Sequence, residues 1–292
     1  MHDARPSRTA ERVAIRRAAH QLVDKPLVFD DPVAVAILGE RAASELRAKT
    51  AKREDRFSRA LRAMMAARGR YAEDQLTTGV SRGVRQYVVL GAGLDTFAYR
   101  NRFRDQGLRV FEVDHPATQA WKRELLNAAG IGLPSELSFV PVNFEQHNLG
   151  EELRKSGFHR EEPAFFSWLG VVMYLTHEAF ASTIKFIGSL PAGSGIALDY
   201  PVEPSSLGLL ERLVFEGVKR RVAAAGEPFR LFFAPRKISA ELEQAGFRDV
   251  EDLGCEQINA RYFTGRADDL HVPTKIYHLL SAWVGESGGD NP

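Results

Sequence analysis

The hydrophobic pattern of the chain changes near residue 80, from helical spacing to short apolar runs. In the first 80 residues apolar positions recur at the spacing of one helix face, as at Ile15, Ala18 and Leu22. Pro26 ends the first helical segment, and Pro32 suits the first turn of the next. Helices are therefore expected over about residues 5–25, from residue 32, and over about 57–76. We interpret residues 1–80 as a helical N-terminal cap.

From residue 86 the pattern is typical of buried strands that alternate with helices. Five short apolar runs predict strands over residues 86–91, 108–114, 137–142, 164–169 and 194–200. Helices are expected between them, opening at Pro116 and covering residues 176–189. Strands and helices in this order predict an α/β protein with a parallel sheet wound on both faces.

After the fifth strand the alternation is interrupted. A helix over residues 205–225 predicts an insertion at about 201–235, and a further helix opens at Pro235. Two final strands are expected over 247–253 and 275–283, joined by a short connection and paired antiparallel at the sheet edge. The main domain would thus span residues 81–284, with a disordered tail over 285–292.

Composition excludes several classes of protein. The 292 residues carry 39 Lys and Arg against 38 Asp and Glu, a net charge of +1 that favours neither nucleic acid nor an anionic membrane. The single cysteine, Cys255, excludes an internal disulfide and a multi-cysteine zinc site, and the histidines show no metal-ligand spacing. With no signal-like or membrane-length apolar run, we expect a cytoplasmic protein without a metal or membrane partner.

A turn of small residues follows the first predicted strand directly. Gly91 and Gly93 let the backbone approach a ligand, and ligands of parallel sheets bind beyond the strand carboxyl ends. Asp114 ends the second strand 114 − 93 = 21 residues later, where a carboxylate can accept hydrogen bonds from ribose hydroxyls. The alternative is a helix cap. Thr96 replaces the third glycine of a dinucleotide motif, which disfavours a nicotinamide dehydrogenase and favours a single adenosine derivative such as S-adenosylmethionine.

Three segments resemble a known family. They are YVVLGAGLDTFAYR (Tyr87–Arg100), VFEVDHP (Val110–Pro116) and WLGVVMYLT (Trp168–Thr176). They are similar to the leucine carboxyl methyltransferase family, and most similar to its bacterial branch of S-adenosylmethionine-dependent O-methyltransferases. Residues 7–10 and 31–32 match the N-terminal pattern of that branch. The resemblance covers most of the chain and implies a Rossmann-like class I methyltransferase sheet, mostly parallel with an antiparallel edge strand, with a helical N-terminal cap and an insertion after the fifth strand.

The same resemblance implies a site for S-adenosyl-L-methionine and its product S-adenosyl-L-homocysteine. The implied residues are Arg68, Gly91, Ala92, Gly93, Asp114, His115, Asn143, Phe144 and Leu169. Arg68 would pair with the cofactor carboxylate, with Arg70 as the alternative register, and a guanidinium suits that role because it forms two parallel hydrogen bonds. Asn143 and Leu169 depart from the family, which commonly has Asp and Glu there.

No fixed catalytic base is evident. Tyr174 and Tyr200 are candidates because they lie near the ends of the fourth and fifth strands, although a buried tyrosine with a bonded hydroxyl is the alternative. His177 could cap a helix or act in catalysis. Three further residues could reach an acidic substrate: Arg261, Tyr262 and Arg266.

We expect an O-methyltransferase that acts on a carboxylate of a small molecule or natural-product intermediate. A carboxylate is already ionised at neutral pH and needs no base, whereas a hydroxyl acceptor benefits from one. A hydroxyl O-methyltransferase and a non-catalytic S-adenosylmethionine-binding protein are the alternatives. The first helix, over residues 5–25, is expected to cover the substrate as a lid.

Overall fold

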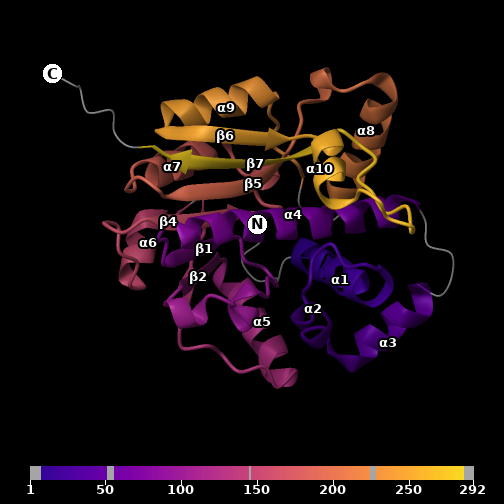
Figure 1. Cartoon of the computed structure of the whole chain (residues 1–292), viewed down its shortest axis with the longest axis horizontal. Coiled ribbons are helices and arrows are strands. Elements are labelled where there is room, and N and C mark those ends of the chain that lie inside the picture. The colour runs from indigo at the N-terminus through magenta and orange to yellow at the C-terminus, as the bar shows by residue number, and fades with distance from the viewer. Residues whose placement is uncertain (1–7, 51–55, 145, 224–227, 286–292) are drawn as a thin grey trace.

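A seven-stranded sheet forms the centre of the protein (Figure 1). The computed structural model describes residues 8–50, 56–144, 146–223 and 228–285. The strands are β1 (Gln86–Leu90), β2 (Arg109–Asp114), β3 (Leu137–Pro141), β4 (Ala164–Trp168), β5 (Gly195–Pro201), β6 (Phe247–Leu253) and β7 (Tyr277–Val284). Their spatial order is β3-β2-β1-β4-β5-β7-β6. The strand β7 runs antiparallel to both of its neighbours, while β1 to β5 are parallel. The expected mostly parallel sheet with an antiparallel edge is confirmed.

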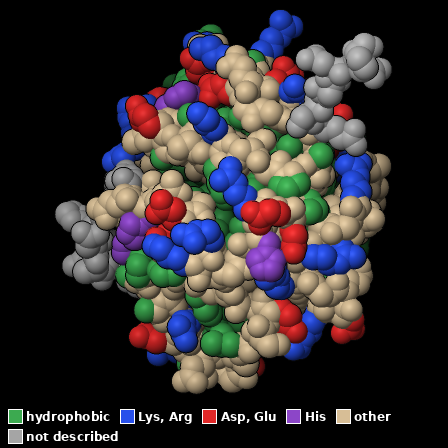
Figure 2. All heavy atoms as spheres, turned by 90° about the vertical axis from the view of Figure 1, so that its left-hand side faces the viewer, with side chains coloured by type: hydrophobic (Ala, Val, Ile, Leu, Met, Phe, Trp, Pro, Cys, Tyr) green, Lys and Arg blue, Asp and Glu red, His purple; other side chains and the backbone are tan. Residues whose placement is uncertain are grey.

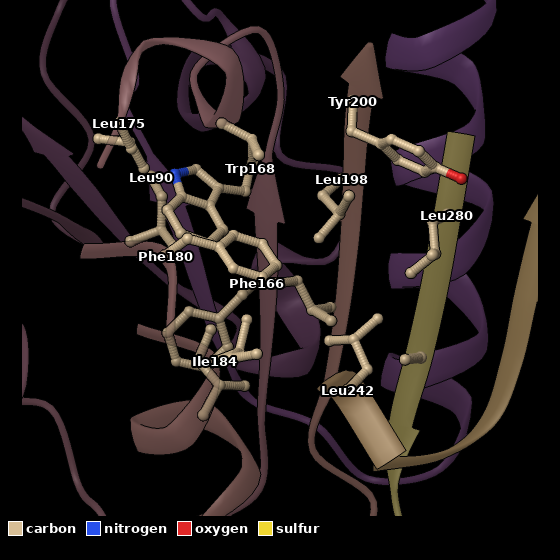
Figure 3. Packing of buried hydrophobic residues seen from close by; sticks show 14 of the residues in the cluster. Leu90, Phe166, Trp168, Leu175, Phe180, Ile184, Leu198, Tyr200, Leu242 and Leu280 are labelled. Carbon is tan, nitrogen blue, oxygen red and sulfur yellow. The ribbon is translucent and has the colours of Figure 1, made fainter. Parts of the chain in front are cut away.

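Every residue of β1, β4 and β5 is buried, as expected for strands covered on both faces. On one face the core is closed by α6 (Leu149–Lys155), α7 (His177–Gly188) and α9 (Pro235–Gln244). Figure 3 shows this core, in which Trp168 of β4 stacks on Phe180 of α7 at 5.7 Å between ring centroids. On the other face α4 (Arg56–Ser81) and α10 (Cys255–Tyr262) bury a second cluster. The helix α5 (Pro116–Ala128) follows β2.

Three helices precede α4: α1 (Arg8–Val23), α2 (Val33–Ala36) and α3 (Gly39–Thr50). They lie beside the carboxyl ends of the parallel strands (Figure 1). A buried ion pair joins α1 to α4, because Arg62 donates to both oxygens of Asp24 at 2.7 and 2.9 Å. His20 completes this network: its Nε2 accepts the backbone N–H groups of Val28 and Phe29, so Nδ1 carries the proton that bonds Asp24.

Two expectations about the C-terminal half need correction. The connection between β6 and β7 is not short, because it contains the helix α10. The insertion helix, α8 (Leu209–Ala223), begins four residues later than expected, because a 3₁₀ turn occupies Pro204–Ser206. Residues 224–225 of the expected helix and 286–292 of the expected tail lie outside the described residues.

The surface at the amino ends of the parallel strands carries both signs of charge. Figure 2 shows Lys and Arg side chains intermixed with Asp and Glu on this face, without a continuous region of one sign. None of the helices within the described part of the chain combines the length and apolar character needed to cross a bilayer. A functional site is therefore expected at the carboxyl ends of the strands, where parallel sheets bind their ligands.

Candidate functional site

A cavity of about 240 Å³ opens at the carboxyl ends of the parallel strands. Its walls come from α1, α4, the turns after β1 to β4, and the segment that follows α8. Ten residues predicted from sequence line it: Arg68, Gly91, Ala92, Gly93, Asp114, His115, Asn143, Phe144, Leu169 and Tyr174. The fold thus gathers at one place all nine residues expected to bind a cofactor, although they are spread over a hundred positions of the sequence.

The glycine turn after β1 forms the floor of this cavity. Gly91 and Gly93 have φ angles of +66° and +49°, which side chains rarely permit. A Cβ on Gly91 would lie 2.3 Å from a methyl carbon of Val171, in the loop after β4. A Cβ on Gly93 would lie 3.1 Å from the Cβ of Ala10, in α1. Both glycines are therefore required by backbone conformation and by close packing.

Asp114 projects from the end of β2 beside this turn. Its Oδ2 accepts the N–H of Gly93 at 2.5 Å and its Oδ1 accepts the N–H of His115 at 2.6 Å. Burial raises the pKa of Asp114, although these two donors favour the carboxylate. The cap of α5 is His115, whose Nδ1 accepts the N–H of Ala117, so Asp114 does not cap the helix. A carboxylate has about four acceptor positions, so two hydroxyl donors can still bind Asp114.

Arg68 brings a buried positive charge to the wall of the cavity. It projects from α4, and its Nη1 donates to Oδ2 of Asp199 in β5 at 3.1 Å. Arg70 is half-exposed, pairs with Asp74 at 2.8 Å on the same helix, and is not part of the cavity lining. Of the two registers predicted for the carboxylate-binding arginine, the geometry therefore supports Arg68.

The comparisons with known proteins agree with this site. The sequence profile of the leucine carboxyl methyltransferase family matches residues 10–188. The chain belongs to this family. A curated relative is YktD of Bacillus subtilis, named for an inferred S-adenosyl-L-methionine-dependent methyltransferase activity; it is 33% identical, over 91% of this chain and 94% of YktD. A Mycobacterium marinum relative with the same kind of name is 33% identical, over 94% of this chain and 93% of its own.

Solved structures show the same fold at low sequence identity. One is a crystal structure from Thermobifida fusca, titled as a methyltransferase by inference, with a TM-score of 0.58 and 15% identity over 94% of each chain. Another, a DUF574 family protein from Streptomyces avermitilis, has a TM-score of 0.57 and 18% identity over 91% of this chain and 99% of its own. The Rossmann-like methyltransferase fold is confirmed, and S-adenosyl-L-methionine is the cofactor of this methyltransferase.

The residues present fit that cofactor. The turn leaves no room for a side chain at Gly91, Asp114 offers acceptors for ribose hydroxyls, and Arg68 offers a guanidinium for a carboxylate. Phe144, whose ring lies 6.4 Å from that of Trp168, provides an apolar wall for a base. The two departures from the methyltransferase family, Asn143 and Leu169, also line the cavity.

The position of Thr96, where a dinucleotide motif has glycine, is explained by the contact between α1 and the turn. Its Oγ1 donates to Asp31 at 2.6 Å and accepts from Arg17 of α1 at 3.1 Å. Arg17 also pairs with Asp31 at 2.6 Å and with Asp95 at 2.8 Å. A glycine at position 96 would remove the hydroxyl that joins these groups.

We expect Thr96→Val to lower the free energy of unfolding by about 1–3 kcal/mol, because it leaves buried partners without that hydroxyl. Chemical denaturation measures this loss, and the affinity for S-adenosyl-L-homocysteine should change less than twofold. Thr77→Val, at an exposed position of α4, is the matched control. A variant as stable as the parent would contradict the assigned role.

Five residues considered from the sequence lie away from the cavity: His177, Tyr200, Arg261, Tyr262 and Arg266. The first is exposed and contacts Glu241, while Thr176 caps α7. The last three bond Glu251, Asp74 and Asp268, respectively. The hydroxyl of Tyr200 donates to Asp252 at 2.7 Å and points toward β7 (Figure 3). Among the catalytic candidates only Tyr174 reaches the cavity.

Sequence reasoning also missed residues that matter here. Arg17 and Arg230 line the cavity, and Asp199 holds Arg68. An acid inside the apolar run of β5 was a usable signal for Asp199, since buried carboxylates are paired. No cluster of three or more metal-binding side chains occurs among residues whose placement is described.

Proposed function

We propose that this S-adenosyl-L-methionine-dependent methyltransferase transfers the methyl group to a carboxylate oxygen of a small molecule. The observation that carries the proposal is the lining of the cavity beyond β4. Arg230 lines the cavity, as do the apolar or aromatic residues Met65, Val171, Tyr174 and Leu175. A cation among apolar groups suits an anionic acceptor with an apolar body.

Different residues would hold the ribose, the adenine and the methionine part of the cofactor. Asp114 would accept the ribose hydroxyls, Asn143 and Phe144 would bracket the adenine, and Arg68 would pair with the methionine carboxylate beside the glycine turn. When bound, the cofactor supplies an activated methyl group on a sulfonium. The task left to the chain is to orient the acceptor and exclude water.

Among the described residues that line the cavity, the histidine and the two carboxylates already have hydrogen-bond partners, which favours a carboxylate acceptor over a hydroxyl. His115 is the histidine of the described cavity lining, and its Nδ1 caps α5. An ionised carboxylate needs no proton removed, whereas an alcohol or phenol does. Asp95 and Asp114 lie in the same lining, but the first pairs with Arg17 and the second accepts two backbone N–H groups beside the glycine turn.

The helix α1 would act as a lid over this site. Thr9, Ala10 and Val13 line the cavity, and Ala10 packs against the glycine turn. A helix placed over the strand ends would keep water from the acceptor once both substrates are bound.

The product distinguishes the candidate reactions. The enzyme is incubated with isotopically methyl-labelled S-adenosyl-L-methionine and a panel of carboxylic acids, phenols and alcohols, and the product is then treated with alkali. A methyl ester releases volatile methanol, as the proposal requires, whereas a methyl ether is stable and would establish a hydroxyl acceptor. Calorimetric binding of the cofactor without any product across the panel would favour a non-catalytic binding protein.

We expect Arg230→Ala to raise the KM for an acidic acceptor by about 3- to 10-fold, because a charge-assisted contact at an exposed position is lost. The Kd for S-adenosyl-L-homocysteine should stay within twofold, which calorimetry measures. Arg236→Ala, an exposed arginine of α9 outside the cavity lining, is the matched control. An unchanged KM in the presence of a proven acceptor would remove Arg230 from the acceptor site.

A further inference from the structure

Asp199 lies directly behind the arginine of the cofactor cavity. Its side chain is 1% exposed, and its two oxygens serve different partners. Oδ2 accepts from Nη1 of Arg68 at 3.1 Å, and Oδ1 accepts the N–H of Gly170 at 2.5 Å. One buried carboxylate thus ties a side chain of α4 to the backbone after β4.

We propose that Asp199 is a positioning residue that holds the Arg68 guanidinium toward the methionine carboxylate of the cofactor. This inference rests on the proposed cofactor site. Arginine is long and flexible, so an unanchored guanidinium would sample many rotamers and lose much of its affinity for a carboxylate. A guanidinium has five N–H donors, so the contact with Asp199 leaves others for a second carboxylate.

Gly170 provides an independent observation for the same arrangement. Its φ angle is +73°, and a Cβ there would lie 2.8 Å from Nη1 and 3.0 Å from Nη2 of Arg68. The guanidinium therefore lies against bare backbone. The register of β4 and β5, in which Trp168 pairs with Leu198, places residues 169–170 beside Asp199. Two strands and one helix thus converge to fix a single side chain.

The test compares two ligands that differ in the methionine end. S-Adenosyl-L-homocysteine carries the carboxylate, whereas 5′-deoxy-5′-methylthioadenosine retains the nucleoside and lacks it. Calorimetry gives both affinities for the full-length parent, Asp199→Asn, Arg68→Met and the double variant. We expect Asp199→Asn to weaken the binding of S-adenosyl-L-homocysteine about 10-fold and the binding of methylthioadenosine less than twofold. Arg68→Met should show the same selectivity with a larger loss of affinity for S-adenosyl-L-homocysteine. The double variant should match Arg68→Met, because both substitutions act through the Arg68 guanidinium.

Two further variants keep the test decisive. Asp252→Asn removes a carboxylate charge from β6, which β7 separates from β5; Asp252 bonds Tyr200 and lies outside the cavity lining, so both affinities should be unchanged. Gly170→Ala keeps the Asp199 carboxylate and places a methyl group against the Arg68 guanidinium, and should reproduce the selective loss even where Asp199→Asn fails to fold. Equal weakening of both ligands by Asp199→Asn, or no weakening, would overturn the inference. A failure of Arg68→Met to discriminate the ligands would instead overturn the assignment of Arg68, and the inference with it.

Discussion

Replacing Asp114 by alanine is expected to weaken the binding of S-adenosyl-L-homocysteine by about 5- to 150-fold, which corresponds to about 1–3 kcal/mol. We propose this carboxylate as the acceptor for the ribose hydroxyls, which without it would lose water on binding and gain no partner. The variant also loses the bond to the Gly93 N–H, which loosens the turn itself. Calorimetric titration measures the affinity directly.

Two comparisons separate these contributions. Asp114→Asn keeps one carbonyl acceptor, so its affinity for S-adenosyl-L-homocysteine should lie between that of the parent and that of Asp114→Ala. Asp105→Ala, at an exposed position before β2, removes an acid of the same type outside the cavity and should bind like the parent. Unchanged affinity in Asp114→Ala would exclude this residue from the cofactor site.

The site around Asp114 could be predicted because its signals are local. A fully apolar run predicts a buried parallel strand, and the residues that follow it must lie at the ligand-binding edge of the sheet. Gly91 and Gly93 lie in the turn after β1, and Asp114 ends β2; since both strands are mostly apolar and parallel, their meeting point follows from topology alone. Asn143 and Phe144, which follow β3 at the same edge of the sheet, were predicted from the family resemblance instead.

Tyr200 and Asp199 show where this reasoning fails. Successive residues of a strand face opposite sides of the sheet, so only one of the two can face α4 and Arg68. A half-exposed strand reveals its faces by alternation, but all seven residues of β5 are buried and carry no such signal. The sequence therefore suggested Tyr200 as a candidate, whereas the structure places Asp199 behind the cavity and turns Tyr200 toward Asp252.

Other features depend on contacts that no local pattern records. The helix α10 has eight residues and buries only Cys255 and Ile258 among those described, so its apolar period is too short to recognise. The contacts of Arg17 with Asp95 and Thr96 span 78 and 79 positions of the sequence. They exist only because α1 packs over the glycine turn, which is a result of tertiary structure.

Removing Arg17 is therefore the sharpest test of how α1 contributes to the site. Deleting residues 1–25 would also remove Asp24 and with it a buried ion pair to Arg62, so loss of activity and loss of fold could not be separated. Arg17→Ala instead keeps the rest of the helix and removes the bonds of this side chain to Asp31, Asp95 and Thr96, together with its contact with the Phe29 ring.

Arg17→Ala is expected to lower the free energy of unfolding by about 2–4 kcal/mol, because Asp31 and Asp95 each lose a charge-assisted bond, although the fully buried Asp31 keeps Arg100 and Thr96 as partners. The melting temperature should fall by about 4–8 °C, and the affinity for S-adenosyl-L-homocysteine should fall with it as the turn loses its contact with α1. Arg12→Ala, at an exposed position on the same helix, is the matched control and should melt with the parent.

The pH dependence of this loss identifies the charge involved. Burial alone would raise the pKa of Asp95, but the charges of Arg17, Lys122 and Arg100 outweigh it and lower the pKa to about 2. A carboxylate with a lowered pKa in the folded state stabilises the fold above its unfolded pKa of about 4, and this contribution disappears as the pH falls toward 2. The difference in stability between the parent and Arg17→Ala should therefore be largest above pH 4 and narrow in acid. A difference that stays constant from pH 7 to pH 2.5 would mean that Arg17 stabilises the position of α1 through packing, and that its charge does not hold α1 on the glycine turn.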